Sequence, residues 1–139
     1  MKYRQAGSTI FLRLERGEEL VASLKEIMNK SIVDGCAKVS GIGATDNVTI
    51  GVFNPKTKVY TKKNIREDME ILSISGNLTR QNGEPYVHIH GSFASLDNVY
   101  GGHINELYIS ATAEIVIDVY QTMIDRFFDE ETGLNLLEL

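Results

Sequence analysis

The sequence predicts a single α+β domain in which one main helix packs against a mostly antiparallel or mixed sheet. Three observations carry this prediction. The 139 residues fit one domain that can bury a core without disulfides or a structural metal. One stretch repeats its apolar residues with helical spacing, and most of the chain after it alternates with the period of two that is typical of strands. No repeat, low-complexity segment or linker divides residues 1–139.

A strand and the main helix are expected first. Residues 8–14 alternate in character, which predicts a strand with one buried face. Residues 18–32 repeat apolar side chains with helical spacing, and two acidic residues in the first turn complement the helix dipole. The pair Asp34-Gly35 is expected to end this helix. The apolar residues are Ile10, Leu12 and Leu14 in the strand and Leu20, Val21, Leu24, Ile27 and Met28 in the helix.

The rest of the chain predicts strands separated by short turns. Turn-forming residues mark positions 54–57 and 81–83. The alternation is longest over residues 107–120, whose apolar face must be buried against the helix or another sheet. In the tail, residues 121–139, a short helix is expected over 123–128, and the apolar end is expected to dock onto its own domain or onto a neighbouring subunit. The expected strands cover residues 36–43, 47–53, 58–61, 69–78, 85–93, 100–104 and 107–120.

The charge and composition of the chain narrow its possible functions. Its 19 acidic and 14 basic side chains give a net charge of −5, so any DNA contact must come from a local patch and not from the whole surface. No apolar run reaches the roughly 20 residues that a membrane span requires, and no secretion signal is expected. The single cysteine, Cys36, has no partner for a disulfide. We therefore expect a cytoplasmic protein in which Cys36 fills the core and is not a nucleophile.

The three histidines of the chain fall in one short window and form its most specific pattern. His88 and His90 lie two residues apart on an expected strand, so both rings point to the same face. A hairpin with its loop at residues 95–98 places His90 opposite His103, within reach of one ion. Three imidazole ligands leave a coordination position open, which predicts a zinc site. Nickel, copper or iron stay open as alternatives, and so does a role for these histidines as surface or hydrogen-bonding residues.

Two glycine pairs accompany the histidine pattern. Gly101 and Gly102 precede His103 and permit either a positive φ or a close backbone approach, near a site or a subunit contact. Gly41 and Gly43 are candidates to line a pocket with backbone amides, although they lack the third glycine of a dinucleotide-binding fingerprint. The alternative for both pairs is a bulge or bend in a strand without any chemistry.

Six segments form a specific, ordered set: residues 12–18, 39–44, 48–55, 70–77, 85–90 and 101–103. In this combination the chain resembles the prokaryotic branch of the plants and prokaryotes conserved (PPC) domain family. The resemblance implies a compact α+β fold that assembles as a homotrimer, with His88, His90 and His103 able to hold a metal near subunit boundaries. It also implies a DNA-binding or regulatory role, because plant members join this domain to an AT-hook and act as nuclear regulators. The Arg-Gly-Arg-Pro segment that would insert into the minor groove does not occur in this sequence.

Three functions stay open from the sequence. A DNA-associated regulator would contact phosphates through a basic cluster on one hairpin edge, unless these side chains only keep the edge solvated. A metal-dependent enzyme or small-molecule sensor would use the histidines to activate a water or polarise a ligand, whereas in a scaffold the metal would only fasten subunits together. Neither a reaction nor a substrate can be read from the residues, which favours the non-enzymatic functions. The basic cluster consists of Lys56, Lys58, Lys62, Lys63 and Arg66.

Overall fold

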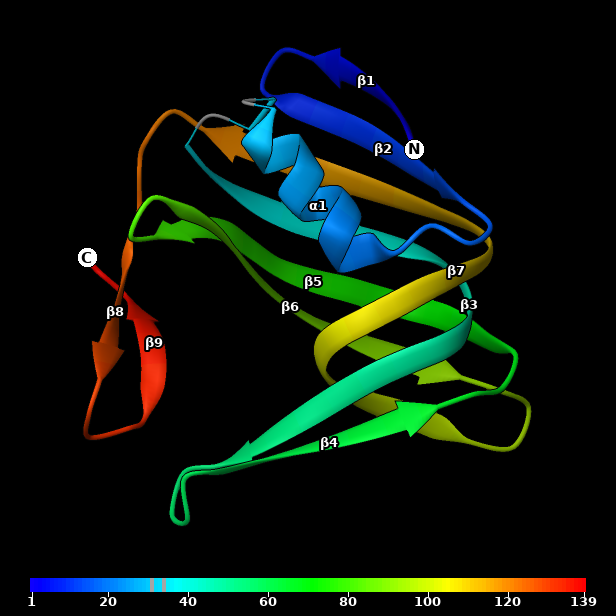
Figure 1. Cartoon of the computed structure of the whole chain (residues 1–139). Helices are drawn as coiled ribbons and strands as arrows, with labels where there is room; N and C mark the ends of the chain where they lie inside the picture. Colours follow the sequence, from blue (N-terminus) through cyan, green and yellow to red (C-terminus); the bar gives the residue numbers. More distant parts are fainter. Residues whose placement is uncertain (31, 34) are drawn as a thin grey trace.

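The computed structural model of the chain describes residues 1–30, 32–33 and 35–139 and has a curved sheet that carries one helix (Figure 1). The elements are β1 (Lys2–Ala6), β2 (Thr9–Glu15), α1 (Leu20–Asn29), β3 (Cys36–Asn54), β4 (Val59–Ile65), β5 (Met69–Gln81), β6 (Glu84–Ala94), β7 (Val99–Tyr120), β8 (Arg126–Asp129) and β9 (Leu134–Leu137). Within the described residues, seven strands form one sheet in the order β1-β2-β7-β6-β5-β3-β4, and β8 and β9 form a separate hairpin.

The expected α+β architecture is wrong, because the described chain is mostly β. Its helix α1 has ten residues and is shorter at both ends than the expected span of 18–32, and Asp34, which was expected to end it, lies outside the described residues. Segments expected as separate strands are joined, so that β3 has 19 residues and β7 has 22. The strand pairs described are all antiparallel. One short helix therefore does not balance the sheet as a second layer.

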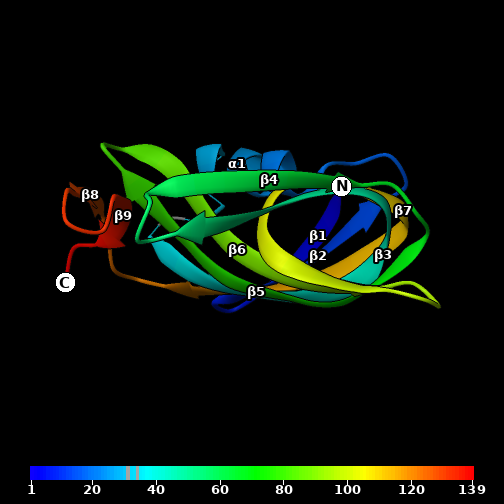
Figure 2. The same cartoon turned by 90° about the horizontal axis from the view of Figure 1, so that it is seen from below.

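The two long strands bend and close part of the sheet on itself. β7 pairs with β2, β6 and β3, and β3 also pairs with β5, so β3, β5, β6 and β7 form a ring (Figure 2). The bends coincide with shifts in register, where β-bulges let a strand turn. At one shift Thr45 is buried, and its hydroxyl donates to the carbonyl of Tyr108 at 2.7 Å. At another, a Cβ on Gly43 would lie only 2.6 Å from the Cα of Ala113, so this position requires glycine.

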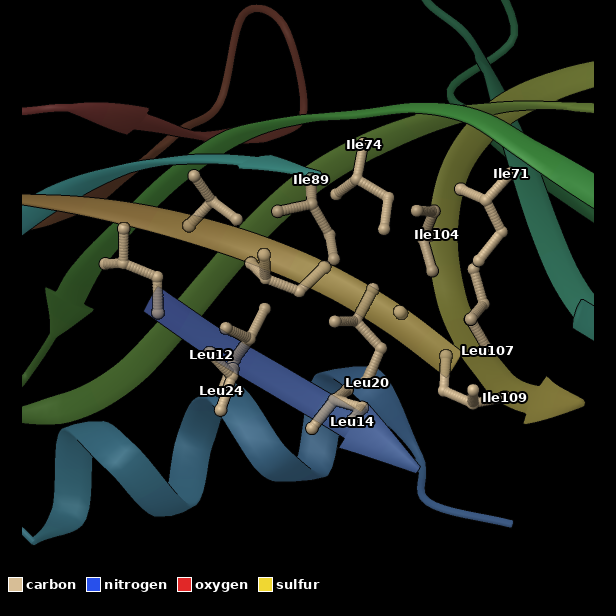
Figure 3. Close-up of a cluster of buried hydrophobic side chains, with 14 of the residues drawn as sticks. Leu12, Leu14, Leu20, Leu24, Ile71, Ile74, Ile89, Ile104, Leu107 and Ile109 are labelled. Atoms are coloured by element: carbon tan, nitrogen blue, oxygen red, sulfur yellow. The ribbon is translucent and has the colours of Figure 1, made fainter. Parts of the chain in front are cut away.

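One hydrophobic core fills the space between the strands and α1. Alternate residues of β2 are buried there, as expected, and α1 packs its apolar side into the same core, against β7 and β6. Figure 3 shows Leu12 of β2 and Leu24 of α1 among these core side chains. The carboxylate of Glu19 accepts hydrogen bonds from the first backbone N–H groups of α1 and from the N–H of Leu107 in β7 at 3.0 Å. Glu19 therefore caps the helix and attaches it to the sheet. Cys36 is buried, which confirms its expected place in the core.

The described helix α1 lacks the length and apolar character that crossing a membrane requires, and no other helix occurs among the described residues.

The C-terminal residues form the β8–β9 hairpin, so the short helix expected over 123–128 is wrong. Several side-chain hydrogen bonds attach this hairpin to the sheet, and two of them lie at the ends of neighbouring strands. The side chain of Gln81, at the end of β5, donates to Asn135 Oδ1 at 2.8 Å. The ammonium of Lys58, in the turn between β3 and β4, donates to the carbonyl of Glu130 at 2.6 Å. The tail thus docks onto its own domain, which is one of the two arrangements that its apolar end predicts.

Candidate metal centre

The three histidines converge on the outer face of the sheet, opposite the core. His88 and His90 lie in β6 and His103 lies in β7, where His90 is paired directly with His103, as the hairpin register predicts. The ring centroids are 5.2 Å apart for His88 and His90, 5.3 Å for His88 and His103, and 5.4 Å for His90 and His103. One ligand nitrogen from each residue lies within 4.8 Å of the other two. Within the described chain, this is the one cluster of His, Cys, Asp or Glu that could hold a metal ion.

The strand pattern explains why these rings share a face. Ile89 is fully buried in the core, so the residues on either side of it project in the opposite direction. The turn between β6 and β7 is closed by two hydrogen bonds: the N–H of Ser95 donates to the carbonyl of Asn98 at 2.9 Å, and the N–H of Asn98 donates to the Ser95 hydroxyl at 3.1 Å. A turn of fixed length sets the register of its hairpin, which brings His103 opposite His90.

The surroundings of His88 and His103 favour the neutral form of these two rings. Burial, followed by the positive charge of Arg126, lowers the pKa of His88 from its ordinary 6.5 to about 4. Burial also lowers the pKa of His103, followed by the neighbouring His90 and the ammonium of Lys62. A metal binds the lone pair of a neutral imidazole, so a lowered pKa leaves these rings ready to act as ligands at neutral pH.

Arg126, the first residue of β8, reaches the centre from the C-terminal hairpin, and sequence analysis does not find it. Its side chain is only 6% exposed, and its Nη2 lies 3.4 Å from Nδ1 of His88. Its guanidinium carbon lies 4.5 Å from the centre of the Tyr86 ring, which holds the group in place. No described carboxylate forms an ion pair with it. Its hydrogen bonds go to neutral groups: the hydroxyl of Thr79 (2.8 Å), the carbonyl of Asn135 (2.7 Å) and Oδ1 of Asn77 (2.7 Å).

Tyr60 of β4 borders the other side of the centre, and it is also missed from the sequence. Its ring centroid lies 6.2 Å from that of His103, and its hydroxyl accepts a hydrogen bond from Asn105 at 2.8 Å. The Tyr60 side chain crosses the strand between them at Gly51, where a Cβ would collide with the ring and its hydroxyl. Gly51 therefore lets an aromatic side chain from the edge strand approach the histidines.

A model of the Plants and Prokaryotes Conserved (PCC) domain matches residues 1–121 of the chain. The protein belongs to the PCC domain family. This confirms the resemblance to the PPC family that the sequence segments carry. The match ends before the β8–β9 hairpin, so Arg126 lies outside the matched part of the domain. A search of curated proteins found no match.

Solved structures of three related proteins have the same fold as this chain. A "putative DNA binding protein" from Bacteroides thetaiotaomicron is 29% identical, with a TM-score of 0.94 over 99% of this chain and 96% of that one. A metal-containing protein from Archaeoglobus fulgidus is 34% identical, with a TM-score of 0.87 over 100% of both chains. A plant- and prokaryote-conserved (PPC) protein from Pyrococcus horikoshii is 31% identical, with a TM-score of 0.85 over 99% of this chain and 95% of that one. The likeness includes the C-terminal hairpin, because the Archaeoglobus protein covers the whole chain.

The two glycine pairs lie in different parts of the PCC domain. Gly102 adjoins the histidines in β7, and a Cβ there would lie 2.9 Å from the carbonyl oxygen of Gly51, so it permits a close backbone approach without a positive φ. Gly41 and Gly43 pair with Ile115 and Ala113 instead, at the other end of β7. They allow close approach of β3 and β7 and do not adjoin the histidines. Gly101 pairs with Ser92 beside the centre.

The predicted basic cluster of this PCC domain does not form one face. Lys62 and Lys63 are adjacent in β4 and point to opposite sides, with Lys62 Nζ 5.9 Å from the centre of the Tyr60 ring and Lys63 Nζ 5.2 Å from that of Tyr100. The ammonium of Lys58 is bound to the carbonyl of Glu130 in the tail. The remaining members, just outside the two ends of β4, are Lys56 and Arg66. A flat phosphate-binding stripe would require these charges to face one way.

Proposed function

We propose that this PCC domain, spanning residues 1–139, binds a zinc ion through His88, His90 and His103. The observation that carries the proposal is the set of three imidazole nitrogens within 4.8 Å of one another. Zinc–nitrogen bonds of about 2.0–2.1 Å in a tetrahedral site place ligand nitrogens roughly 3.4 Å apart, so small rotations of the three rings suffice. The donor set also fits zinc in kind, because imidazole is among its preferred ligands. The metal-containing relative from Archaeoglobus fulgidus supports the binding of a metal, without specifying which one.

Three protein ligands leave a fourth position for a water or a ligand. Zinc held by the three histidines would act as a Lewis acid, which lowers the pKa of a bound water or polarises a bound group. The chain's own contribution is to hold His90 and His103 in one hairpin register and to keep the ring of His103 neutral by lowering its pKa. Tyr60 and the Arg126 side chain border the same face from two sides. The face is therefore suited to a small ligand at the metal.

Zinc titration of purified protein, followed by calorimetry and elemental analysis, tests the proposal. We expect one zinc per chain in the natural sequence and a loss of binding of at least about 100-fold in His90→Ala, because one of three ligands is removed. The circular dichroism spectrum should not change, since His90 is exposed and faces away from the core. Ser92→Ala, on the same strand face, is the matched control and should bind zinc normally. Absence of zinc binding by the natural sequence would rule the proposal out.

A second candidate function is association with DNA, as a regulator. It is favoured by the relative from Bacteroides thetaiotaomicron, which is described as a "putative DNA binding protein". The exposed basic side chains of β4 would contact phosphates, repeated in each subunit of an assembly. In a gel-shift assay at moderate salt, Lys62→Glu with Lys63→Glu should then weaken binding more than His90→Ala does. Binding that disappears near physiological salt, or that is insensitive to the two lysine changes, would argue against this function.

A homotrimer is proposed as the working assembly. Its support, besides the family resemblance, is the exposure of apolar side chains on the sheet: Ile42 is 57% exposed and Leu72 is 53% exposed, at adjoining positions of β3 and β5. Light scattering after size exclusion should give a mass about three times the 15.5 kDa of one chain. Leu72→Glu should lower this mass, whereas Glu70→Gln on the same strand should not. If the metal only fastens subunits together, a chelator alone will produce monomers.

A further inference from the structure

We propose that the open position of the histidine centre binds a small carboxylate, held jointly by the metal and by Arg126. This inference rests on the proposed zinc site and names the class of ligand that would complete it. It makes the C-terminal hairpin, which lies beyond the matched part of the PCC domain, a part of the binding site.

The surroundings of the histidine centre carry positive charge that lacks a counter-ion among the described residues. The Arg126 guanidinium is 6% exposed, and its described partners are all neutral. A buried charge without a counter-ion is costly, which is why such groups are usually paired. On the other side, the ammonium of Lys62 lies 5.9 Å from the centre of the Tyr60 ring, which itself borders His103. No described carboxylate is hydrogen-bonded to a histidine ring of the centre. A divalent cation would add its charge to these two positive side chains, and a bound anion would offset part of the total.

The hydrogen bond between Arg126 and His88 is incompatible with a metal on His88. A guanidinium has no lone pair, so at the 3.4 Å contact Nδ1 of His88 must be the acceptor and its proton must lie on Nε2. A metal on Nε2 would shift this proton to Nδ1, facing the N–H of Arg126, and a metal on Nδ1 would take the place of that N–H. In either case, metal binding by neutral His88 breaks the contact with Arg126. Metal-binding histidines usually have the opposite neighbour, a carboxylate or carbonyl that accepts their N–H.

Metal binding would leave N–H donors of Arg126 available for a ligand. Of the five N–H groups of Arg126, three are bound to Thr79, Asn135 and Asn77, one points to His88, and one on Nη1 has no partner among the described residues. Once the metal displaces the His88 contact, two N–H groups are free. A carboxylate can place one oxygen on the metal and the other on a guanidinium, in a charge-assisted hydrogen bond. The Tyr86 ring fixes the guanidinium plane, so it is positioned before the ligand arrives.

The test compares metal affinity and anion affinity in the natural protein and in Arg126→Gln. Cobalt(II) replaces zinc, so that its visible spectrum reports coordination, in a chloride-free buffer. Acetate is the probe, and acetamide is its neutral control of the same shape. Without an anion, Arg126→Gln should bind cobalt about tenfold more tightly, because a competing donor and a positive charge are removed. Acetate should bind the cobalt-loaded variant about tenfold more weakly, while acetamide should not perturb either spectrum.

The two opposite changes separate this role from a structural one. A merely structural Arg126 would weaken metal and acetate binding together, and that result would overturn the proposal. Because Arg126 is buried and its replacement affects packing as well as charge, Lys62→Gln provides a second test at an exposed position. It should shift both affinities in the same directions by about twofold, as expected for a more solvated charge. No change in either affinity on this substitution would also count against the inference.

Failure of the two proposals can be told apart. If the natural protein binds neither zinc nor cobalt, the zinc site is wrong and the carboxylate site fails with it. If metal binds and depends on His90, but acetate leaves the cobalt spectrum unchanged or binds Arg126→Gln equally well, only the carboxylate site is wrong.

Discussion

The surroundings of His88 have two opposing effects on metal binding: they keep the ring unprotonated, and they place a positive charge beside it. Its ring is partly buried beside the guanidinium of Arg126, and this environment resists a second proton on the imidazole. Metal ions and protons compete for the same nitrogen lone pair. The low pKa of His88 therefore keeps this one ligand unprotonated at mildly acid pH, although the neighbouring cation works against a bound metal.

The stability of the metal-free protein should depend on pH through His88. The pKa of this ring is about 4 in the folded chain and close to 6.5 when unfolded, so between these values the unfolded state binds more protons. Stability should consequently be complete above pH 6.5 and decrease as the pH falls toward 4, by on the order of 2 kcal/mol once partial exposure is considered. Urea denaturation with a chelator, at pH 7 and pH 4.5, measures the change.

The matched variant for this prediction is His88→Asn, which has no proton to gain in this range. Its loss of stability between the two pH values should be smaller than that of the natural sequence by the contribution of His88. Equal losses in the two proteins would show that the ring titrates normally in the folded chain.

The residues of the centre differ in how far the sequence predicts them. His90 and His103 could be paired from the chain alone, because a short hairpin loop and the period of two fix which side chains meet. Arg126 could not, since its partners Thr79 and Asn77 lie on β5, far away in the sequence. Residues 121–139 have no clean period that would identify their strands or the strand they contact. The sequence predicts a strand at Gly51 but not the role of this glycine, because its contact with Tyr60 also depends on tertiary structure.

The bulged strands β3 and β7 are the elements that shape the fold. They lie close together at Gly43, where a Cβ would be 2.5 Å from the carbonyl oxygen of Thr112 and 2.6 Å from the Cα of Ala113. Gly51 is also tightly packed, but there the neighbour is the side chain of Tyr60. The first contact involves backbone that cannot move without disturbing the ring of strands, whereas the second involves a ring that can rotate away.

Gly43→Ala should therefore destabilise the protein by about 1–3 kcal/mol, the usual cost of overpacking a rigid interior. Gly51→Ala should cost less, because Tyr60 can leave its position, and should instead alter the surroundings of His103. Chemical denaturation measures the first effect, and the chemical shifts of the histidine ring protons report the second. A Gly43→Ala protein as stable as the natural one would mean that β3 and β7 can separate at this point without loss.

At the scale of elements, most strands could be predicted and their connections could not. The alternation within β2, β5 and β6 is visible because one face of each is buried. β1 escapes prediction because all five of its residues are exposed. The segments of β3 and β7 looked like separate strands because bulges interrupt the alternation, although the backbone continues through them. Counting α1 as a layer then led to the wrong fold class, because ten helical residues cover only part of the sheet.

For the molecule as a whole, the core and the candidate metal centre are on opposite sides of the same strands. Ile89 and Ile104 are buried, and the histidines next to them in β6 and β7 face outward. The core therefore forms from side chains that do not depend on a metal. Metal binding adds stability only in proportion to its affinity for the folded state.

Removal of the metal should leave the chain folded and less stable. We expect an unchanged β-sheet circular dichroism spectrum in excess chelator and a lower Tm than in zinc. With free zinc at 100 times its Kd, the stabilisation would be about 2.7 kcal/mol. Thermal scans at one fixed protein concentration measure it, and His90→Ala should show no difference between the two conditions. A chain that unfolds when the metal is removed would mean that the ion holds the core together.

The position of β7 in the chain has a consequence for how the protein is made. β2 has β1 and β7 as its sheet neighbours, and the ring of strands closes where β3 meets β7. During translation, β2 and β3 therefore emerge before their partner β7, each with an unpaired edge. The apolar side chains of Ile10, Leu12 and Leu14 remain exposed to solvent at this stage. Only after about Tyr120 has left the exit tunnel can both edges be covered by a single strand. A nascent PCC chain that stalls before this point exposes two unpaired strand edges at once, which is the condition that favours pairing with other chains.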